Sequence, residues 1–167
     1  MPYLAKLLAF VLLPQKKWEE EWVSALAEFF GEVEHFGDFF PFDKTNYYER
    51  EMGQGLYRTV ISFKGLIAPE NIGEFKRKSI ELEGRFKRGG GRVLNIDIGY
   101  MDTDKVVLPS TKRGPFKLYM GDNIWLDMLL TYAKGNFYPT AWAFADFKEN
   151  IYKRDLLIIR EKYKFDI

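Results

Sequence analysis

A polar segment between residues 40 and 53 carries three acids, two tyrosines, a threonine and an asparagine, with no clean helical or strand period. Loops held on a rigid scaffold are where binding residues concentrate. Carboxylates, hydroxyls and phenols can accept or donate hydrogen bonds to a polar ligand, and carboxylates also suit hard cations. The segment therefore predicts a ligand site, formed by Asp43, Thr45, Tyr47, Tyr48, Glu49 and Glu51.

Two predicted strands add further polar groups to this candidate site. In the strand over residues 92–100 the two-residue period places Asn95 and Asp97 on one face, and in the strand over residues 124–133 it places Asp127 beside Trp125 and Thr131. An aspartate buried without a partner in an apolar strand is costly, so each needs a cation, a donor or water. The alternative is that both strands are half exposed and their aspartates face solvent.

If those strand faces meet, Asp97 and Asp127 could share a divalent ion or flank Lys112. Hard cations prefer carboxylates, so the hypothesis is a Mg²⁺ or Mn²⁺ site formed by Asp97, Asp127 and Glu49. In an enzyme, the groups expected at the reacting atoms are Asp97, Asp127 and Lys112.

The segment from residue 110 to residue 114 supplies two hydroxyls, two cations and a glycine after a short apolar strand. That chemistry suits a phosphate or carboxylate group. It is also typical of a solvated hairpin turn, which is the interpretation we favour for the segment itself. Ser110 completes the candidate ligand-binding set together with Asn95 and Tyr100.

The basic residues near residues 76–92 have a simpler interpretation. Lys76, Arg77, Lys78, Arg85, Lys87, Arg88 and Arg92 could form a positive patch, but the acids between them favour a solvated helix face. The run Gly89-Gly90-Gly91 is not a phosphate-binding loop, because it ends the predicted helix and no Gly-Lys-Ser/Thr follows.

Composition excludes several classes of function. The 167 residues carry a formal charge of +1, so a nucleic acid is not expected as the main partner. The chain has no cysteine and a single histidine, His35, which excludes disulfides, thiolate chemistry and multi-histidine metal sites. The apolar run over residues 4–13 is too short to span a membrane and lacks signal-peptide features, so we expect a cytoplasmic protein. The few glutamines and many charged residues fit a heat-adapted organism.

The order of predicted elements indicates an α+β fold. Strands over residues 3–13, 32–40, 56–63 and 92–100 alternate with helices over residues 15–30 and 68–88 in the order βαββαβ. This is the ferredoxin-like split βαβ arrangement. Further antiparallel strands over residues 105–108, 116–120 and 124–133, an irregular aromatic segment over 137–147 and a C-terminal helix over 148–163 extend it. Residues 1–167 are expected to form one domain, since no repeat or linker interrupts them.

Several motifs occur in combination along the chain. They are Phe40-Pro41-Phe42-Asp43 with Thr45, Tyr47-Tyr48-Glu49, Glu51-Met52-Gly53, Asn95-x-Asp97-x-Gly99-Tyr100, Val107-Leu108-x-Ser110-x-Lys112, Tyr119 with Gly121, Trp125-x-Asp127-x-x-Leu130-x-Tyr132, and the segment from Trp142 to Phe147. The combination resembles an uncharacterised bacterial and archaeal family, the domain of unknown function 4416. The resemblance spans most of the chain and supports the candidate positions without implying a reaction. Ile98 departs from the family pattern, which has proline there, and Pro115-Phe116 stands where a histidine often precedes the strand.

Three functions are compatible with these observations. The first is a ligand-binding protein or enzyme that acts on a phosphorylated or nucleotide-like small molecule through the acidic site. The second is an RNA-binding module that stacks bases on sheet aromatics, although no such aromatic-glycine motif is present. The third is a non-catalytic interaction protein or a homodimer that uses the aromatic segment or an open sheet edge as its surface. We favour the first.

Overall fold

The continuous apolar run near the start of the chain forms the centre of an antiparallel sheet. The computed structural model describes residues 3–167, and in it this run forms β1 (Lys6–Leu13), of which every residue is buried. β1 lies between β4 (Tyr57–Phe63) and β7 (Asn95–Met101) and pairs antiparallel with both. A strand covered on both faces tolerates few polar residues, which explains why the run shows no alternation.

The main sheet has nine strands within the described residues. Its order is β11-β10-β8-β7-β1-β4-β2, with β3 also paired to β4 and β9 also paired to β10. All of these pairs are antiparallel. The other strands of this sheet are β2 (Val33–Phe36), β3 (Phe40–Pro41), β8 (Lys105–Ser110), β9 (Leu118–Gly121), β10 (Ile124–Ala133) and β11 (Asn136–Pro139).

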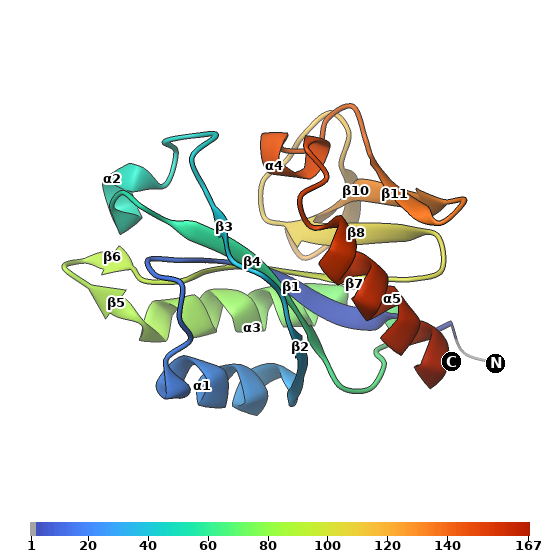
Figure 1. Cartoon of the computed structure of the whole chain (residues 1–167), viewed down its shortest axis with the longest axis horizontal. Coiled ribbons are helices and arrows are strands. Elements are labelled where there is room, and N and C mark those ends of the chain that lie inside the picture. Colours follow the sequence, from blue (N-terminus) through green and yellow to red (C-terminus); the bar gives the residue numbers. More distant parts are fainter. Residues whose placement is uncertain (1–2) are drawn as a thin grey trace.

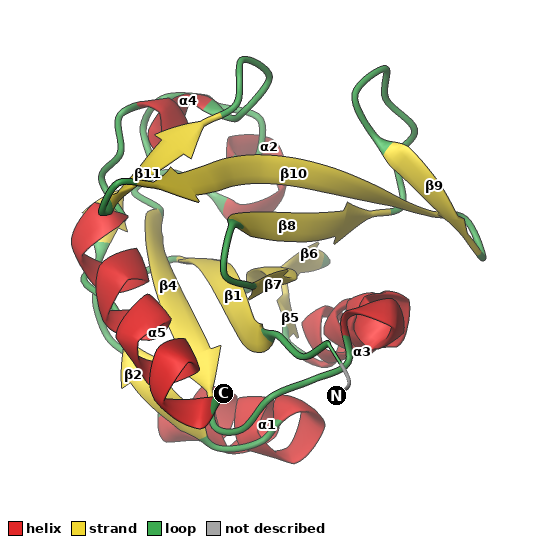
Figure 2. Ribbon diagram, turned by 90° about the vertical axis from the view of Figure 1, so that its right-hand side faces the viewer, coloured by secondary structure: helices red, strands yellow, loops and turns green. Residues whose placement is uncertain are grey.

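Helices cover both faces of the sheet (Figure 1). On one side lie α1 (Glu20–Phe30) and α3 (Ile72–Arg85), which follows a short 3₁₀ turn over Pro69–Asn71. On the other side α5 (Lys153–Asp166) crosses the sheet, as Figure 2 shows, and α4 (Ala145–Lys148) precedes it. The short α2 (Glu49–Met52) stands at one end, beyond β3. None of the helices in the part of the chain that the structure describes is long and apolar enough to cross a membrane.

Each side of the sheet has its own apolar core. The α1/α3 side buries Ile96 and Ile98 of β7, and Leu94 just before this strand, against the two helices. The α5 side buries Phe10 of β1 against the rings of Phe147 and Tyr152, with centroids 4.7 Å and 5.3 Å away. The alternation predicted for residues 92–100 is therefore correct, and it leaves Asn95 and Asp97 on the α5 side of the sheet.

The predicted α+β class is confirmed, but several element bounds differ from the prediction. α3 ends at Arg85, and the glycines that follow form a hairpin turn between β5 (Lys87–Arg88) and β6 (Gly91–Arg92). Gly89 and Gly90 both have positive φ, 60° and 83°, which is the conformation that tight hairpin turns require. The glycines therefore reverse the chain instead of capping the helix.

Four other predicted segments differ from the structure in their extent. The strand predicted over residues 32–40 is divided into β2 and β3, and the first helix begins at Glu20. The aromatic segment over residues 137–147 is partly regular, since it contains most of β11 and the start of α4. The last helix begins at Lys153, after Asn150 turns the chain with a φ of 57°.

Candidate ligand-binding site

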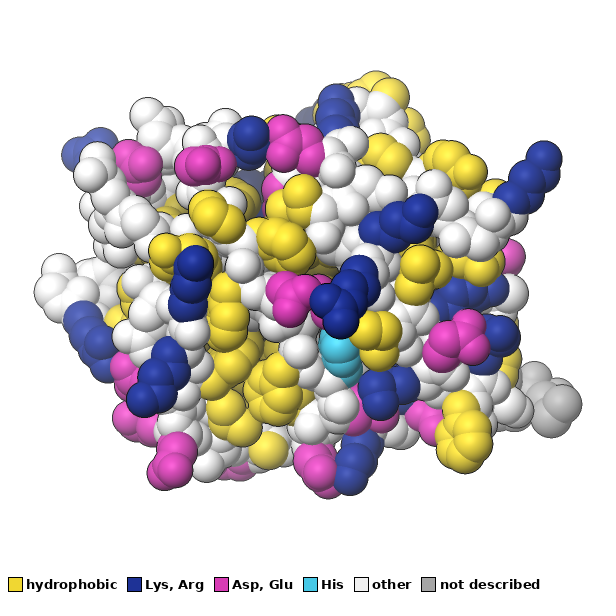
Figure 3. Space-filling view, viewed as in Figure 1, with side chains coloured by type: hydrophobic (Ala, Val, Ile, Leu, Met, Phe, Trp, Pro, Cys, Tyr) yellow, Lys and Arg dark blue, Asp and Glu magenta, His cyan; other side chains and the backbone are white. Residues whose placement is uncertain are grey.

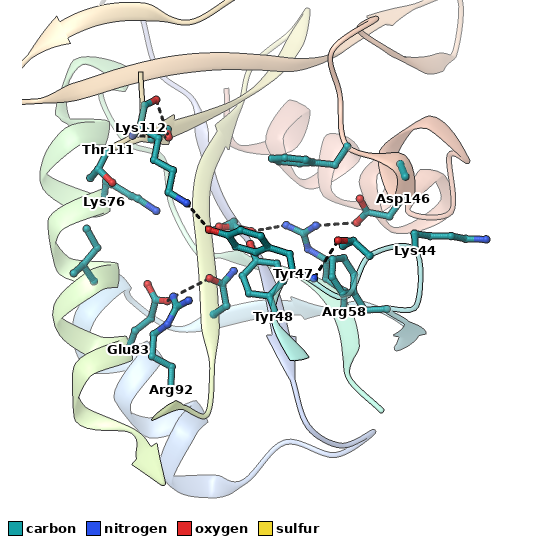
Figure 4. Close-up of a pocket in the computed structure, with 18 of the residues that line it drawn as sticks. Lys44, Tyr47, Tyr48, Arg58, Lys76, Glu83, Arg92, Thr111, Lys112 and Asp146 are labelled. Atoms are coloured by element: carbon teal, nitrogen blue, oxygen red, sulfur yellow. Dashed lines mark hydrogen bonds and ion pairs between the residues drawn. The ribbon is translucent and has the colours of Figure 1, made fainter. Parts of the chain in front are cut away.

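β7 and β8 separate after a short stretch of pairing, and a cavity lies where they diverge. The two strands are in register only at Tyr100 with Val107 and at Met101 with Val106. The cavity of about 610 Å³ is lined by the other end of β7, the end of β8 and the segment after it, α3, the loop over residues 42–48 and the start of α4 (Figure 4). This volume is typical of small-molecule sites.

A buried arginine forms the floor of the cavity. Arg58 in β4 is 4% exposed, and its two terminal nitrogens donate to Asp97 at 2.5 Å and to Asp146 at 2.9 Å. The Tyr152 hydroxyl donates to the same Asp146 oxygen at 2.6 Å. Burial acts to lower the pKa of Arg58, but the attraction of the two carboxylates outweighs it and the pKa is raised. The guanidinium is therefore charged, and its charge is already compensated.

A second arginine holds the elements on the opposite side of the cavity together. Arg92 in β6 makes a two-pronged ion pair with Glu51 of α2 at 2.7 Å and 2.9 Å, and it also pairs with Glu83 of α3. Its Nη1 donates to Asn95 Oδ1 at 2.9 Å. The hydrogen bonds to Glu51 raise the pKa of Arg92, while burial raises the pKa of Glu83. Arg92 therefore fixes α2 against α3 and β7.

Four lysines also line the cavity, and we refer to three of them, Lys76, Lys112 and Lys117, as the lysine cluster. Lys112 Nζ donates to the Tyr47 hydroxyl at 2.7 Å. Lys117 Nζ donates to Ser110 Oγ and to the Lys112 carbonyl, both at 3.1 Å. Within residues 3–167 none of the three forms an ion pair with an acid. Figure 4 shows Lys76 and Lys112 extending toward the cavity from α3 and from the segment after β8.

Aromatic rings from the 42–48 loop and from Phe144, just before α4, face the same space. Tyr47 and Tyr48 contact each other edge to face with centroids 5.0 Å apart, and Phe42 lies 5.8 Å from Tyr48. Phe144 is 56% exposed at the cavity. The hydrogen bond from Lys112 lowers the pKa of Tyr47, whereas burial raises the pKa of Tyr48 to about 12. The cavity therefore combines cations with apolar rings.

The structure brings together seven of the residues that were predicted from the sequence to form the site. They come from three separate segments and line one cavity: Thr45, Tyr47, Tyr48, Asn95, Asp97, Ser110 and Lys112. Ser110 accepts a hydrogen bond from the Lys112 backbone N–H at 3.0 Å, so the segment over residues 110–114 is at once a turn and part of the cavity wall. Five other candidates, Asp43, Glu49, Glu51, Tyr100 and Asp127, are not among the lining residues.

The three acids predicted to share a metal ion are not brought together. Within the described chain no group of three or more Asp, Glu or His side chains is placed to hold a metal. Asp97 pairs with Arg58, and Asp127 accepts a hydrogen bond from Trp142 Nε1 at 3.0 Å. Each strand aspartate thus has its own partner. The predicted metal site is not assembled because Asp127 lies in register with Leu108 in the body of the sheet, away from the end of β8 that borders the cavity.

The other candidate residues outside the cavity are buried in the core, paired with another side chain or exposed to solvent. Tyr100 lies on the α1/α3 side of β7 and is 7% exposed in that core, where burial raises its pKa. Glu51 pairs with Arg92 instead of facing a ligand, and this pairing lowers its pKa. Asp43 is exposed beside the cavity loop.

Sequence reasoning missed the cations that shape the cavity. Arg58 stands in an otherwise apolar strand, and a charged residue in such a strand is a signal that an acidic partner must lie nearby. Lys76 and Arg92 were assigned to a solvated helix face, although both line the cavity. No local sequence pattern indicated that Lys117 lines the cavity, because the residue reaches it only when the chain after β8 turns back toward Ser110.

Fold and site together define an α+β protein with a nine-stranded antiparallel sheet and a cavity lined by cations and aromatic rings. Its family is settled by comparison with family models. The model of the "Domain of unknown function (DUF4416)" matches residues 3–163, and the chain belongs to this family. No curated protein and no solved structure matches the chain.

Proposed function

We propose that this protein binds a phosphorylated or nucleotide-like small molecule in the cavity between β7, α3 and the 42–48 loop. One observation carries the proposal: the lysine cluster lines the cavity without an acidic partner in residues 3–167. Lysine ammonium groups bind phosphate as point charges, and serine and threonine hydroxyls add donors. Ser110 and Thr111 supply such hydroxyls on the same wall.

The positive charge of the cavity is local. Six cationic and three acidic residues line it, whereas the whole chain has a formal charge of only +1. On the face in Figure 3, basic and acidic side chains are interspersed and do not form a single basic patch. The two arginines and Lys44 are paired with acids, so the lining cations without an ion-pair partner in residues 3–167 are those of the lysine cluster. This distribution favours a compact anionic ligand over an extended polyanion.

The aromatic rings support a ligand that also has an apolar or planar part. Phe42, Tyr47, Tyr48 and Phe144 contribute apolar surface to the same cavity. Stacking of a base on an aromatic side chain contributes about 1–3 kcal/mol, so even one ring contact would add measurably to the affinity for a nucleotide. Inorganic phosphate would contact the lysine cluster alone.

A divalent ion would have a smaller role than the acidic site predicted from the sequence. Mg²⁺ is commonly held by one or two carboxylates together with phosphate oxygens of the ligand. Asp97 is the only one of the three candidate metal ligands that lines the cavity. We therefore infer that Mg²⁺ or Mn²⁺, if used, enters with the phosphorylated ligand.

We also propose that the first part of the sheet is a ferredoxin-like core. The elements β1, α1, β2, β4, α3 and β7 supply the βαββαβ order along the chain. Their strands lie in the spatial order β7-β1-β4-β2 with antiparallel neighbours, which supports the assignment. β8, β10 and β11 then extend the sheet beyond β7.

Thermal unfolding with a panel of phosphorylated compounds tests the binding proposal. A ligand that binds only the native state raises the midpoint of unfolding, so pyrophosphate and nucleoside phosphates should stabilise the protein. K112A and K117A should each weaken binding at least tenfold, as expected for loss of a charged hydrogen bond of about 1.5–3 kcal/mol. Lys17 is exposed and lies outside the cavity, so K17A controls for the change in net charge.

Two results would overturn the proposal. One is an unfolding midpoint that no phosphorylated compound changes. The other is a K17A variant that loses as much stabilisation as K112A and K117A, because the effect would then come from overall charge and not from the cavity.

A further inference from the structure

Two polar side chains on β7 offer hydrogen-bonding groups to the cavity, and a phosphate could satisfy only one of the two. Asn95 and Asp97 are two residues apart and therefore share one face of the strand, about 7 Å apart along it. Both line the cavity, beyond the lysine cluster. Their free atoms differ in character, one being a donor and the other an acceptor.

The donor is the amide nitrogen of Asn95. Arg92 Nη1 donates to Asn95 Oδ1 at 2.9 Å, and a guanidinium has no acceptor, so the orientation of the amide is fixed. Asn95 Nδ2 then has no hydrogen-bond partner in residues 3–167, although the residue is only 6% exposed. The amide N–H therefore lines the cavity without a protein partner, where an acceptor atom of a ligand can reach it.

The acceptor is the second carboxylate oxygen of Asp97. Its Oδ2 accepts from Arg58 Nη2, while Oδ1 has no partner in the described part of the chain. The side chain of Asp97 is 23% exposed, compared with 5% for Arg58 beneath it. A ligand phosphate next to Asp97 would meet another anion, whereas a hydroxyl can donate to it.

A hydroxyl group both donates and accepts, and neighbouring hydroxyls on a sugar suit a donor and an acceptor that stand on one strand face. We propose that Asn95 and Asp97 recognise the hydroxyl groups of a sugar, so that the ligand is a sugar phosphate or a nucleotide with free sugar hydroxyls. This inference rests on the proposed function, because it places the phosphate at the lysine cluster. The cavity of about 610 Å³ has room for both parts, whereas a phosphate alone would fill little of it.

Calorimetric titration with two matched phosphate monoesters tests the inference. Ribose 5-phosphate carries hydroxyls, whereas n-pentyl phosphate has the same number of carbons and the same phosphate without them. The wild-type protein should bind ribose 5-phosphate at least tenfold more tightly, since sites that hydrogen-bond a hydroxyl reject analogues that lack it. Asn95→Ala should lower this ratio, because the variant has no amide to donate to a hydroxyl, although Asp97 can still accept from one. K112A should weaken the binding of both esters equally.

The outcomes separate the two proposals. If neither ester binds, the phosphate site fails and the hydroxyl site fails with it. If both esters bind equally well, or if Asn95→Ala keeps the full wild-type ratio of the two affinities, the phosphate site stands and the hydroxyl inference is wrong. Asp97→Asn provides a second variant, but Arg58 loses its charged partner in it. Asn95→Ala leaves the contacts of Arg58 intact and therefore decides the question if Asp97→Asn does not fold.

Discussion

Each strand aspartate has a partner of the kind that its burial requires. Asp97 pairs with Arg58, and Asp127 accepts the indole N–H of Trp142. The sequence could predict that each needed a cation, a donor or water, because a lone carboxylate in an apolar strand is costly. It could not predict which, because Arg58 is 39 residues from Asp97 and Trp142 is 15 residues from Asp127. These pairings replace the shared metal ion that the pattern of acids had suggested.

Asp127 leads to a prediction about the dependence of stability on pH. It is 8% exposed, and burial raises its pKa above the ordinary value of 3.8, despite the nearby charge of Lys117. A raised pKa in the folded state means that the group contributes most stability below its unfolded pKa and loses that contribution as the pH rises through the folded pKa. D127N cannot titrate, and its amide oxygen can still accept from Trp142.

The stability of D127N relative to the wild type should therefore increase from pH 4 to pH 7 in urea titrations. If the substitution itself changes the free energy of unfolding by a constant amount, the whole D127N curve is displaced, but its difference from the wild type still increases with pH. If the free energies of unfolding of D127N and the wild type differ by the same amount at every pH, the charged form of Asp127 is not unfavourable in the folded protein.

At the scale of elements, local patterns predicted the faces of the strands better than their ends. The alternation over residues 94–98 correctly separated the core residues Leu94, Ile96 and Ile98 from Asn95 and Asp97. The glycines after α3 were predicted to end the helix but form a hairpin turn, because glycine suits both positions. No local sequence pattern predicts that β7 and β8 separate after two residue pairs, since this depends on which strands become neighbours in the sheet.

Gly99 sets how closely β7 and β8 approach beside the cavity. A Cβ at this position would lie 2.3 Å from Leu108 Cδ2 and 2.4 Å from the Val107 carbonyl oxygen. We predict that G99A destabilises the protein by about 1–3 kcal/mol, the usual cost of overpacking, and weakens anion binding because β8 must move. Urea denaturation and titration with pyrophosphate measure the two effects.

Gly84 provides the matched control for this substitution. It lies in α3 without a positive φ, and a Cβ added to it would meet no atom within 4 Å. G84A should therefore stabilise the protein by roughly 0.5–1 kcal/mol, as alanine does in helix interiors. A G99A variant as stable as G84A would contradict the close contact between β7 and β8.

At the scale of the molecule, the cavity depends on six segments of the sequence. The sequence nominated seven of the lining residues because polar groups stood out from loops and strand faces. It missed Arg58, Lys76, Arg92 and Lys117, because lysines and arginines are common on solvated surfaces and their convergence follows only from the order of the sheet. The apolar strands were easier to predict, since burial on both faces leaves a continuous signal in the sequence.

The central claim is that the lysine cluster binds an anion inside the cavity. A crystal soaked with tungstate, an electron-dense analogue of phosphate, tests it most directly through the anomalous signal of the tungsten. We predict a tungstate within hydrogen-bonding distance of Lys112 and Lys117 Nζ and of Ser110 Oγ. An anion bound only on the outer face of α3, at Arg77 or Lys78, or no bound anion at all, would contradict the account.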